Sequence, residues 1–270
     1  MSNYIQIKIE NISSQQSEIL VAQLSGIGFD GFEEGENFLS AFIEEEKFDE
    51  GKLNDVLQNN FSYSKNILKQ KNWNEEWEKN FEPVIVDDFV AVRAEFHEPI
   101  KNVEHEIIIT PKMSFGTGHH ATTYMMMQQM RSIDFKNKDV FDFGTGTGIL
   151  AILAEKLGAA SITAIDNDEW SIKNAKENIQ KNNCKKNSLQ LTDVPPSSKK
   201  FDIILANINR NVILENISAL SKMLNKNAQM LVSGLLQEDE EAIKNAAFKA
   251  GLIYVDTIPR DKWILIKFLP

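Results

Sequence analysis

Four polar side chains stand at the ends of segments that read as strands. The segments are "DVFDFG", "SITAID", "SLQLTD" and "DIILAN", and the side chains are Asp142, Asp166, Asp193 and Asn207. In doubly wound sheets, ligands bind at the carboxyl ends of the parallel strands. A carboxylate there can accept hydrogen bonds from both hydroxyls of a ribose. An amide oxygen can accept a hydrogen bond from an amine and orient its lone pair. These residues predict a nucleoside site next to an amine nucleophile.

Two of these positions have alternative interpretations. Asp166 could be the N-cap of the following helix, although Asn167 and Asp168 are better placed for that role. Asp193 could approach an adenine amino group, or it could form a turn before Pro195. Asp166 is therefore the predicted ribose ligand, and Asp193 stays open between the two roles.

The tetrapeptide FGTG occurs twice, at 115–118 and at 143–146. The second copy lies between a predicted strand and a helix, where glycines let the backbone turn sharply and approach a ligand. A P-loop is excluded, because no lysine followed by serine or threonine closes the loop. A dinucleotide loop remains possible, since Gly146, Gly148 and Ala151 fit G-x-G-x-x-A.

Asp142 distinguishes a dinucleotide from S-adenosylmethionine as the ligand, because its carboxylate immediately precedes the second loop. A carboxylate beside a pyrophosphate would meet like charge in a partly desolvated cleft. S-adenosylmethionine carries a cationic sulfonium and an ammonium group and has no phosphate. The pattern of Asp142 with Gly144 and Gly146 therefore favours S-adenosylmethionine over NAD.

The flanking residues of the first FGTG do not match those of the second, so the two loops are not an internal duplication. We expect Phe115 and Gly116 to cover the same cleft. We also expect Thr122 and Thr123 to open a helix there and to present their hydroxyls to the ligand. His119 and His120 lack the further ligands that zinc needs, so no metal site is predicted.

Around these residues the sequence predicts two domains and a linker. Residues 1–70 read as strand–helix–strand–strand–helix–strand, which is typical of a ferredoxin-like α+β domain. Residues 71–82 predict a linker helix, with Trp73 and Trp77 on one face for packing or for substrate contact. In 83–270, strands alternate with helices and the chain ends in a hairpin. This α/β pattern predicts a mostly parallel, Rossmann-like sheet with an antiparallel C-terminal hairpin.

Composition and charge indicate which partners and which compartment to expect for this protein. The net charge of −10 disfavours nucleic acid and anionic lipid and suits a basic partner such as a lysine-rich protein. The single cysteine, Cys184, rules out an intramolecular disulfide. The N-terminus does not read as a signal peptide, and no apolar run has the length of a membrane span. We therefore expect a cytoplasmic protein that binds neither membranes nor nucleic acid.

Five segments carry a resemblance to a known family. In order and spacing, "FGTGHHATT", "DFGTGTGILAILAEKLGA", "AIDND", "LANIN" and "LVSGLL" resemble the ribosomal protein L11 methyltransferase family, chiefly over 110–240. The resemblance implies a seven-stranded class I methyltransferase fold and a small N-terminal domain that recognises the substrate. It also implies methyl transfer from S-adenosylmethionine to lysine side chains and the N-terminal amine of L11, free or ribosome-bound. We expect the protein to be a monomer.

The resemblance also assigns roles to residues. Thr123, Gly144, Asp166 and Asn207 match cofactor-contacting positions, and Asn207 also borders the acceptor amine. The chain departs from the family pattern at Thr145 and Thr147, where Cys and Ser are common, at Ala121, which replaces a common proline, and at Asn209, where Leu is usual. Asn209 is the departure that bears on the acceptor pocket.

The implied reaction needs a neutral amine, whereas a lysine with a pKa of about 10.4 is protonated at neutral pH. The site must favour the neutral form through desolvation and acceptors such as Asn207, and no residue of the sequence is assigned as a general base. Two alternatives stay open. One is a lysine methyltransferase of the same fold acting on another protein, and the more remote one is an NAD-binding oxidoreductase.

Overall fold

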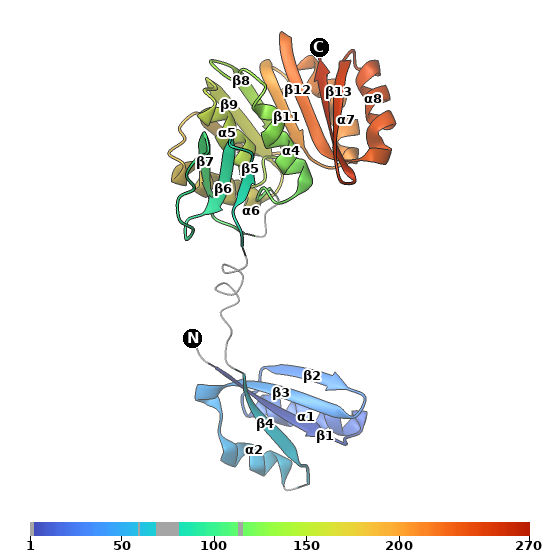
Figure 1. Cartoon of the computed structure of the whole chain (residues 1–270). Helices are drawn as coiled ribbons and strands as arrows, with labels where there is room; N and C mark the ends of the chain where they lie inside the picture. The colour runs from blue at the N-terminus through green and yellow to red at the C-terminus, as the bar shows by residue number, and fades with distance from the viewer. Residues whose placement is uncertain (1–2, 59, 69–80, 113–115) are drawn as a thin grey trace. The chain divides into compact units, whose positions relative to one another are not determined.

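The computed structural model describes residues 3–58, 60–68, 81–112 and 116–270, and the chain divides into two compact units, Met1–Asn80 and Phe81–Pro270 (Figure 1). Each unit is described by itself. Most of the predicted linker helix at 71–82, including Trp73 and Trp77, lies outside the described residues, and so does Phe115.

The first unit is a four-stranded antiparallel sheet with two helices. Its order along the sheet is β2-β3-β1-β4, the ferredoxin-like arrangement that the sequence predicts. Alternate residues of β1, Ile5, Ile7 and Ile9, are buried in its core. Ser13 begins α1 with a capping box closed by Gln16. The elements are β1 (Tyr4–Glu10), α1 (Ser14–Gly26), β2 (Gly31–Gly35), β3 (Phe38–Glu44), α2 (Glu50–Leu57) and β4 (Tyr63–Leu68), with a 3-10 turn η1 at Glu45–Lys47.

The second unit begins with a three-stranded sheet, β5 (Val84–Val86), β6 (Val90–Ala94) and β7 (His105–Ile109). Helices and strands then alternate, as the sequence predicts, and the chain closes with an antiparallel hairpin. The further elements are α4 (Ala121–Met130), β8 (Asp139–Phe143), α5 (Ile149–Lys156), β9 (Ser161–Asp166), α6 (Glu169–Lys181), β10 (Asn187–Leu191), β11 (Phe201–Asn207), α7 (Arg210–Lys222), β12 (Leu224–Leu236), η2 (Gln237–Asp239), α8 (Glu240–Lys249), β13 (Ile253–Arg260) and β14 (Trp263–Leu269).

The main sheet has seven strands in the order β10-β9-β8-β11-β12-β14-β13. β8 to β12 pair in parallel, and β14 pairs antiparallel to both β12 and β13. The prediction of a mostly parallel sheet with an antiparallel C-terminal hairpin is confirmed. The chain moves outward from β8 in both directions, so the switch point lies between β8 and β11, where a ligand crevice is expected.

The central strands β8, β9 and β11 are buried on both faces of this sheet, which explains why they are mostly apolar, whereas the edge strands β10 and β13 are largely exposed. α4, α5 and α6 contribute to the core on one face, and α7 and α8 contribute to the core on the other (Figure 1). The register aligns Leu205 with Asp142 and Ala206 with Phe143, so Asn207 and Gly144 emerge at the same edge. Within the described residues, no helix has the length and apolarity to cross a membrane.

Candidate functional site

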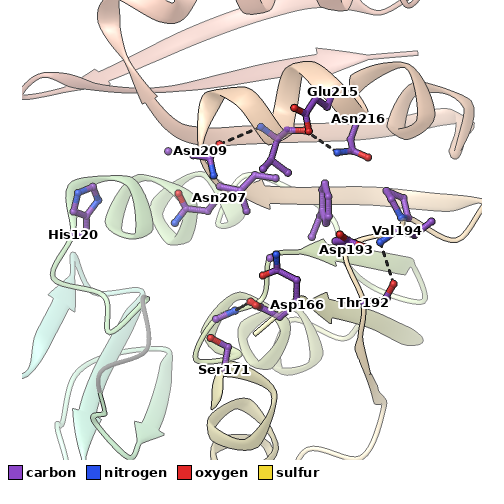
Figure 2. A pocket seen from close by; sticks show the side chains of 18 of the residues that line it. His120, Asp166, Ser171, Thr192, Asp193, Val194, Asn207, Asn209, Glu215 and Asn216 are labelled. Carbon is purple, nitrogen blue, oxygen red and sulfur yellow. Dashed lines mark hydrogen bonds between the residues drawn. The ribbon is translucent and has the colours of Figure 1, made fainter. Parts of the chain in front are cut away.

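A pocket of about 760 Å³ opens at the carboxyl edge of the main sheet (Figure 2). In Figure 2, His120 and Val194 lie at opposite ends of this pocket, and Asn207 lies between them. The pocket is lined by His120, Phe143, Gly144, Gly146, Asp166, Asn167, Ser171, Thr192, Asp193, Val194, Pro195, Asn207, Ile208, Asn209, Val212, Glu215, Asn216, Gly234 and Trp263.

The second glycine loop, residues 143–148, forms one wall. Gly144, Gly146 and Gly148 all have positive φ angles, which explains the glycine at each position. A Cβ on Gly144 would stand 2.2 Å from Cγ2 of Ile208. The loop therefore packs directly against the chain that follows Asn207, and a larger residue at 144 cannot fit without displacing Ile208.

Asp166 is half-buried at the end of β9 and faces the loop. Its Oδ2 accepts a hydrogen bond from the Gly146 N–H over 2.9 Å, and its Oδ1 accepts one from the Asp168 N–H over 3.0 Å. The cap of α6 is Asp168, whose carboxylate accepts from the N–H groups of Trp170 and Ser171. Asp166 is thus not the helix cap, and its oxygens keep further lone pairs for a ligand.

Asp142 is buried behind the loop and is not among the residues that line the pocket. Its Oδ2 accepts a hydrogen bond from the Thr145 hydroxyl over 2.6 Å. Its Oδ1 has no hydrogen-bond partner among the described residues. Burial raises the pKa of this carboxyl to about 7, the Thr145 hydroxyl opposes the rise, and the charge of Asp166 adds to it. Asp142 therefore contacts the loop that forms the wall, and a direct contact with a cofactor stays a prediction.

Asn207 lines the pocket at the end of β11 and is 8% exposed. Its Nδ2 donates to the hydroxyl of Thr123, 3.1 Å away on α4. Its Oδ1 is buried and has no hydrogen-bond partner among the described residues. Thr123 is fully buried and does not line the pocket. Its predicted role as a cofactor contact stays a prediction, while its hydroxyl orients the amide of Asn207.

The first glycine loop lies against the second. The hydroxyl of Thr147 donates to the carbonyl of Gly116 over 2.6 Å. This contact agrees with the expectation that the first loop covers the same region, although Gly116 does not line the pocket and Phe115 lies outside the described residues. Thr122 is fully buried and close to His120, with 2.7 Å between its Oγ1 and Nδ1 of the imidazole.

The two histidines have separate surroundings. Nε2 of His119 lies 2.9 Å from the Glu82 carbonyl, while His120 caps α4 and lines the pocket. Burial lowers the pKa of His120, and Lys262 lowers it further, so its imidazole is neutral at pH 7. Among the described residues there is no cluster of three or more His, Cys, Asp or Glu that could hold a metal ion.

Several lining residues were not predicted from the sequence. Trp263, at the start of β14, packs edge-on against His120 with 4.6 Å between ring centroids. Glu215 and Asn216 extend the wall from α7, and Val194 does so from the loop after β10 (Figure 2). Only Asp193, which the sequence predicts at a strand end, pointed to that last loop; it lies two residues beyond the end of β10 at Leu191, and it does line the pocket. Trp263 had no comparable local signal.

These features fit one kind of ligand. The pocket brings Asp166 and Asp193 together with an unpaired amide oxygen, and none of its lining residues is a lysine or arginine. A pyrophosphate would meet like charge here, whereas a cationic, phosphate-free nucleoside is favoured. The residues therefore fit S-adenosylmethionine better than NAD.

The strand order and the position of this pocket define a class I, Rossmann-like methyltransferase. A family model described as "Ribosomal protein L11 methyltransferase (PrmA)" matches residues 8–269. The chain belongs to the ribosomal protein L11 methyltransferase family.

Individual relatives agree with the family match. A ribosomal protein L11 methyltransferase of Porphyromonas gingivalis is 39% identical over 262 residues, which cover 94% of this chain and 90% of the relative. One from Chlorobaculum tepidum is 37% identical, covering 97% and 95%. The crystal structure of a ribosomal protein L11 methylase from Lactobacillus delbrueckii subsp. bulgaricus is 30% identical, covers 70% of this chain and 98% of that chain, and superposes with a TM-score of 0.64.

Proposed function

We propose that this protein transfers methyl groups from S-adenosylmethionine to amines of ribosomal protein L11, namely lysine side chains and the N-terminal amine. The family match and the relatives' names support L11 as the substrate. The acidic, glycine-lined pocket supports the methyl donor. Recognition of the substrate by the first unit, a cytoplasmic location and a monomeric state remain predictions from the sequence.

The observation that carries the proposal is the unpaired Oδ1 of Asn207. A buried carbonyl oxygen without a hydrogen-bond donor is costly, on the order of 1–3 kcal/mol, so such atoms in a pocket wall indicate a missing partner. The Thr123 hydroxyl occupies the Nδ2 side of the amide, which leaves Oδ1 as the free acceptor. An amine nucleophile supplies the N–H donor that this oxygen lacks.

The residues of the chain then act on the acceptor amine. S-adenosylmethionine supplies an electrophilic methyl group on a cationic sulfonium. Asn207 accepts a hydrogen bond from the amine and orients its lone pair, and desolvation beside this nearly buried side chain favours the neutral amine over the ammonium ion. Neutral His120 adds no positive charge to a site that must admit a cation. No residue is assigned as a general base, and the proton of the amine leaves to water.

Mass spectrometry of purified L11 after incubation with the protein and S-adenosylmethionine tests this function. We expect mass increments of one methyl group or multiples of it, at lysines and at the N-terminus, and none with Asn207→Ala over the same time. A parallel incubation with cell extract lacking L11 tests the other-protein alternative. Methylation of a different protein, with L11 unchanged, would overturn L11 as the substrate. Binding of NAD and not of S-adenosylmethionine would overturn the whole reaction.

A further inference from the structure

Three asparagines spaced four residues apart form a ladder on one face of α6. They are Asn174, Asn178 and Asn182, and they face the edge of β7 and the residue that follows it. The amide of Asn182 donates to the Ile108 carbonyl over 2.6 Å and accepts from the Ile108 N–H over 3.0 Å. Its side chain thus satisfies both backbone groups of Ile108, as a neighbouring strand would.

Asn178 uses the same amide group differently. Its Oδ1 accepts from the Thr110 N–H over 2.7 Å, but its Nδ2 donates to the carbonyl of Thr147 over 2.8 Å. Thr147 belongs to the second glycine loop, between Gly146 and Gly148. Asn178 is fully buried, so water does not replace either bond. This one side chain therefore joins the residue after β7 to the glycine loop.

Thr147 makes a second connection to the same region. Its hydroxyl donates to the carbonyl of Gly116, and Thr147 is itself fully buried. Thr110 and Gly116 are thus both tied to Thr147, one through Asn178 and the other directly. On the opposite side of the loop, the Gly146 N–H donates to Asp166. The hydrogen bonds of Thr147 to Asn178 and Gly116, and that of Gly146 to Asp166, therefore hold the backbone conformation of the loop from both sides.

We propose that Asn178 is a positioning residue for the cofactor, which holds the second glycine loop in its ligand-binding conformation through the Thr147 carbonyl. The proposal rests on the proposed function, because it takes this loop to be the wall that S-adenosylmethionine contacts. Asn178 does not line the pocket, so it acts on the ligand only through Thr147. Its removal should weaken cofactor binding and leave the methyl-transfer step, which depends on Asn207, little changed.

The substitution Asn178→Asp isolates this role. It keeps an oxygen acceptor for the Thr110 N–H and places a second oxygen against the Thr147 carbonyl, where two acceptors repel each other. Asn182→Asp is the matched control, because it makes the same chemical change in the same ladder without contacting the glycine loop. Both variants lose an amide donor, which is fully buried at Asn178 and partly buried at Asn182, where it also bonds the Asn178 carbonyl over 2.8 Å. Both are therefore expected to lower the melting temperature.

Calorimetric titration of the full-length protein with S-adenosylhomocysteine, the demethylated cofactor, tests the proposal without requiring turnover. We expect Asn178→Asp to raise Kd about tenfold and Asn182→Asp to change it by less than about twofold. At saturating S-adenosylmethionine, kcat of Asn178→Asp should stay within about threefold of wild type, so that the loss falls on KM for the cofactor.

Asn178→Ser, which removes both hydrogen bonds without adding charge, makes the same test if the aspartate variant does not fold. The proposal is overturned if a folded Asn178 variant binds with the Kd of wild type, or if Asn182→Asp raises Kd to the same extent. If wild type itself does not bind S-adenosylhomocysteine, it is the proposed function that fails.

Discussion

The side-chain amide of Asn207 donates to the hydroxyl of Thr123 over 3.1 Å, between residues that lie 84 positions apart in the sequence. This hydrogen bond joins the Nδ2 end of the amide to Thr123 on α4 and leaves the buried Oδ1 without a partner among the described residues. The unpaired amide oxygen can accept a hydrogen bond from the N–H of an incoming amine. Thr123 therefore contacts the side chain that is proposed to orient the acceptor amine, although Thr123 itself does not line the pocket.

Asn207→Ala should lower kcat far more than it weakens cofactor binding. The variant removes the acceptor that orients the amine lone pair, and a loss of alignment of this kind costs about 100-fold in rate. Asn216→Ala is a matched control, because Asn216 also lines the pocket but its Nδ2 donates to the Val212 carbonyl of its own helix. Initial rates with L11 and calorimetry with S-adenosylhomocysteine measure the two quantities. Equal losses of kcat and of affinity would remove Asn207 from the methyl-transfer step.

Gly144→Ala should be poorly tolerated for two separable reasons. Gly144 has a φ of +74°, and a Cβ there would stand 2.2 Å from Cγ2 of Ile208. Gly251→Ala is the control for the cost of the backbone conformation alone. Gly251 has a φ of +83°, but a Cβ added there would have no atom within 4 Å. The left-handed conformation costs an alanine about 1–2 kcal/mol. We expect Gly144→Ala to lose more unfolding free energy than this, measured by urea denaturation, and also to lose cofactor affinity.

A second substitution checks the cause of that loss. Ile208→Ala removes the Cγ2 atom that the new Cβ would meet, so the double variant Gly144→Ala/Ile208→Ala should recover part of the cofactor affinity. A double variant that binds no better than Gly144→Ala would show that the backbone conformation, and not the close approach to Ile208, makes glycine necessary at this position.

The sequence alone was sufficient to predict the site residues that lie at or just after the ends of parallel strands. Asp166 and Asn207 each follow an apolar run, and parallel strands place their ends at one edge, so their approach to one pocket follows from the alternation of strands and helices. Gly144 and Gly146 were predictable for the same reason, together with the need for positive φ. These positions can therefore be predicted from the local sequence pattern and from the rule that ligands bind at the carboxyl ends of parallel strands.

Contacts between distant elements were not predictable in this way. Trp263 reaches the pocket because β14 pairs with β12, and no residue near Trp263 in the sequence indicates that pairing. Thr123 and Asp142 were expected to touch the ligand, but neither lines the pocket: Thr123 is fully buried and Asp142 nearly so. Such burial depends on how α4 and the loop pack against the sheet, and a motif alone cannot specify it.

The buried carboxyl of Asp142 should make stability depend on pH. Burial raises its pKa from the ordinary value to about 7, so between about pH 4 and 7 the folded protein holds a proton that the unfolded chain releases. The unfolding free energy should therefore fall as pH rises through this window. Asp142→Asn lacks this titration, so wild type should lose stability relative to the variant by a few kcal/mol between pH 4 and 7.

Urea denaturation of both proteins at several pH values measures this difference, and the exposed Asp134→Asn serves as the control for removing a carboxylate. A constant difference between wild type and Asp142→Asn across the window would contradict the raised pKa.

The same variant also tests which cofactor binds, because an NAD site should tolerate the loss of this charge. We expect Asp142→Asn to bind S-adenosylmethionine more weakly than wild type at pH 8, where the carboxyl is ionised.

Asn209 should matter for the stability of α7 more than for catalysis. It is the N-cap of this helix, and its Oδ1 accepts from the Val212 N–H over 3.1 Å. Asn209→Ala should therefore cost about 1 kcal/mol of unfolding free energy, while Asn209→Asp, which keeps the cap, should cost little. The Oδ1 of Asn209 already accepts the capping hydrogen bond, so we do not expect it to contact the acceptor amine. The kcat of Asn209→Asp should therefore stay within about twofold of wild type. A loss of turnover by Asn209→Asp at unchanged stability would instead give this pocket-lining residue a direct part in binding the acceptor amine.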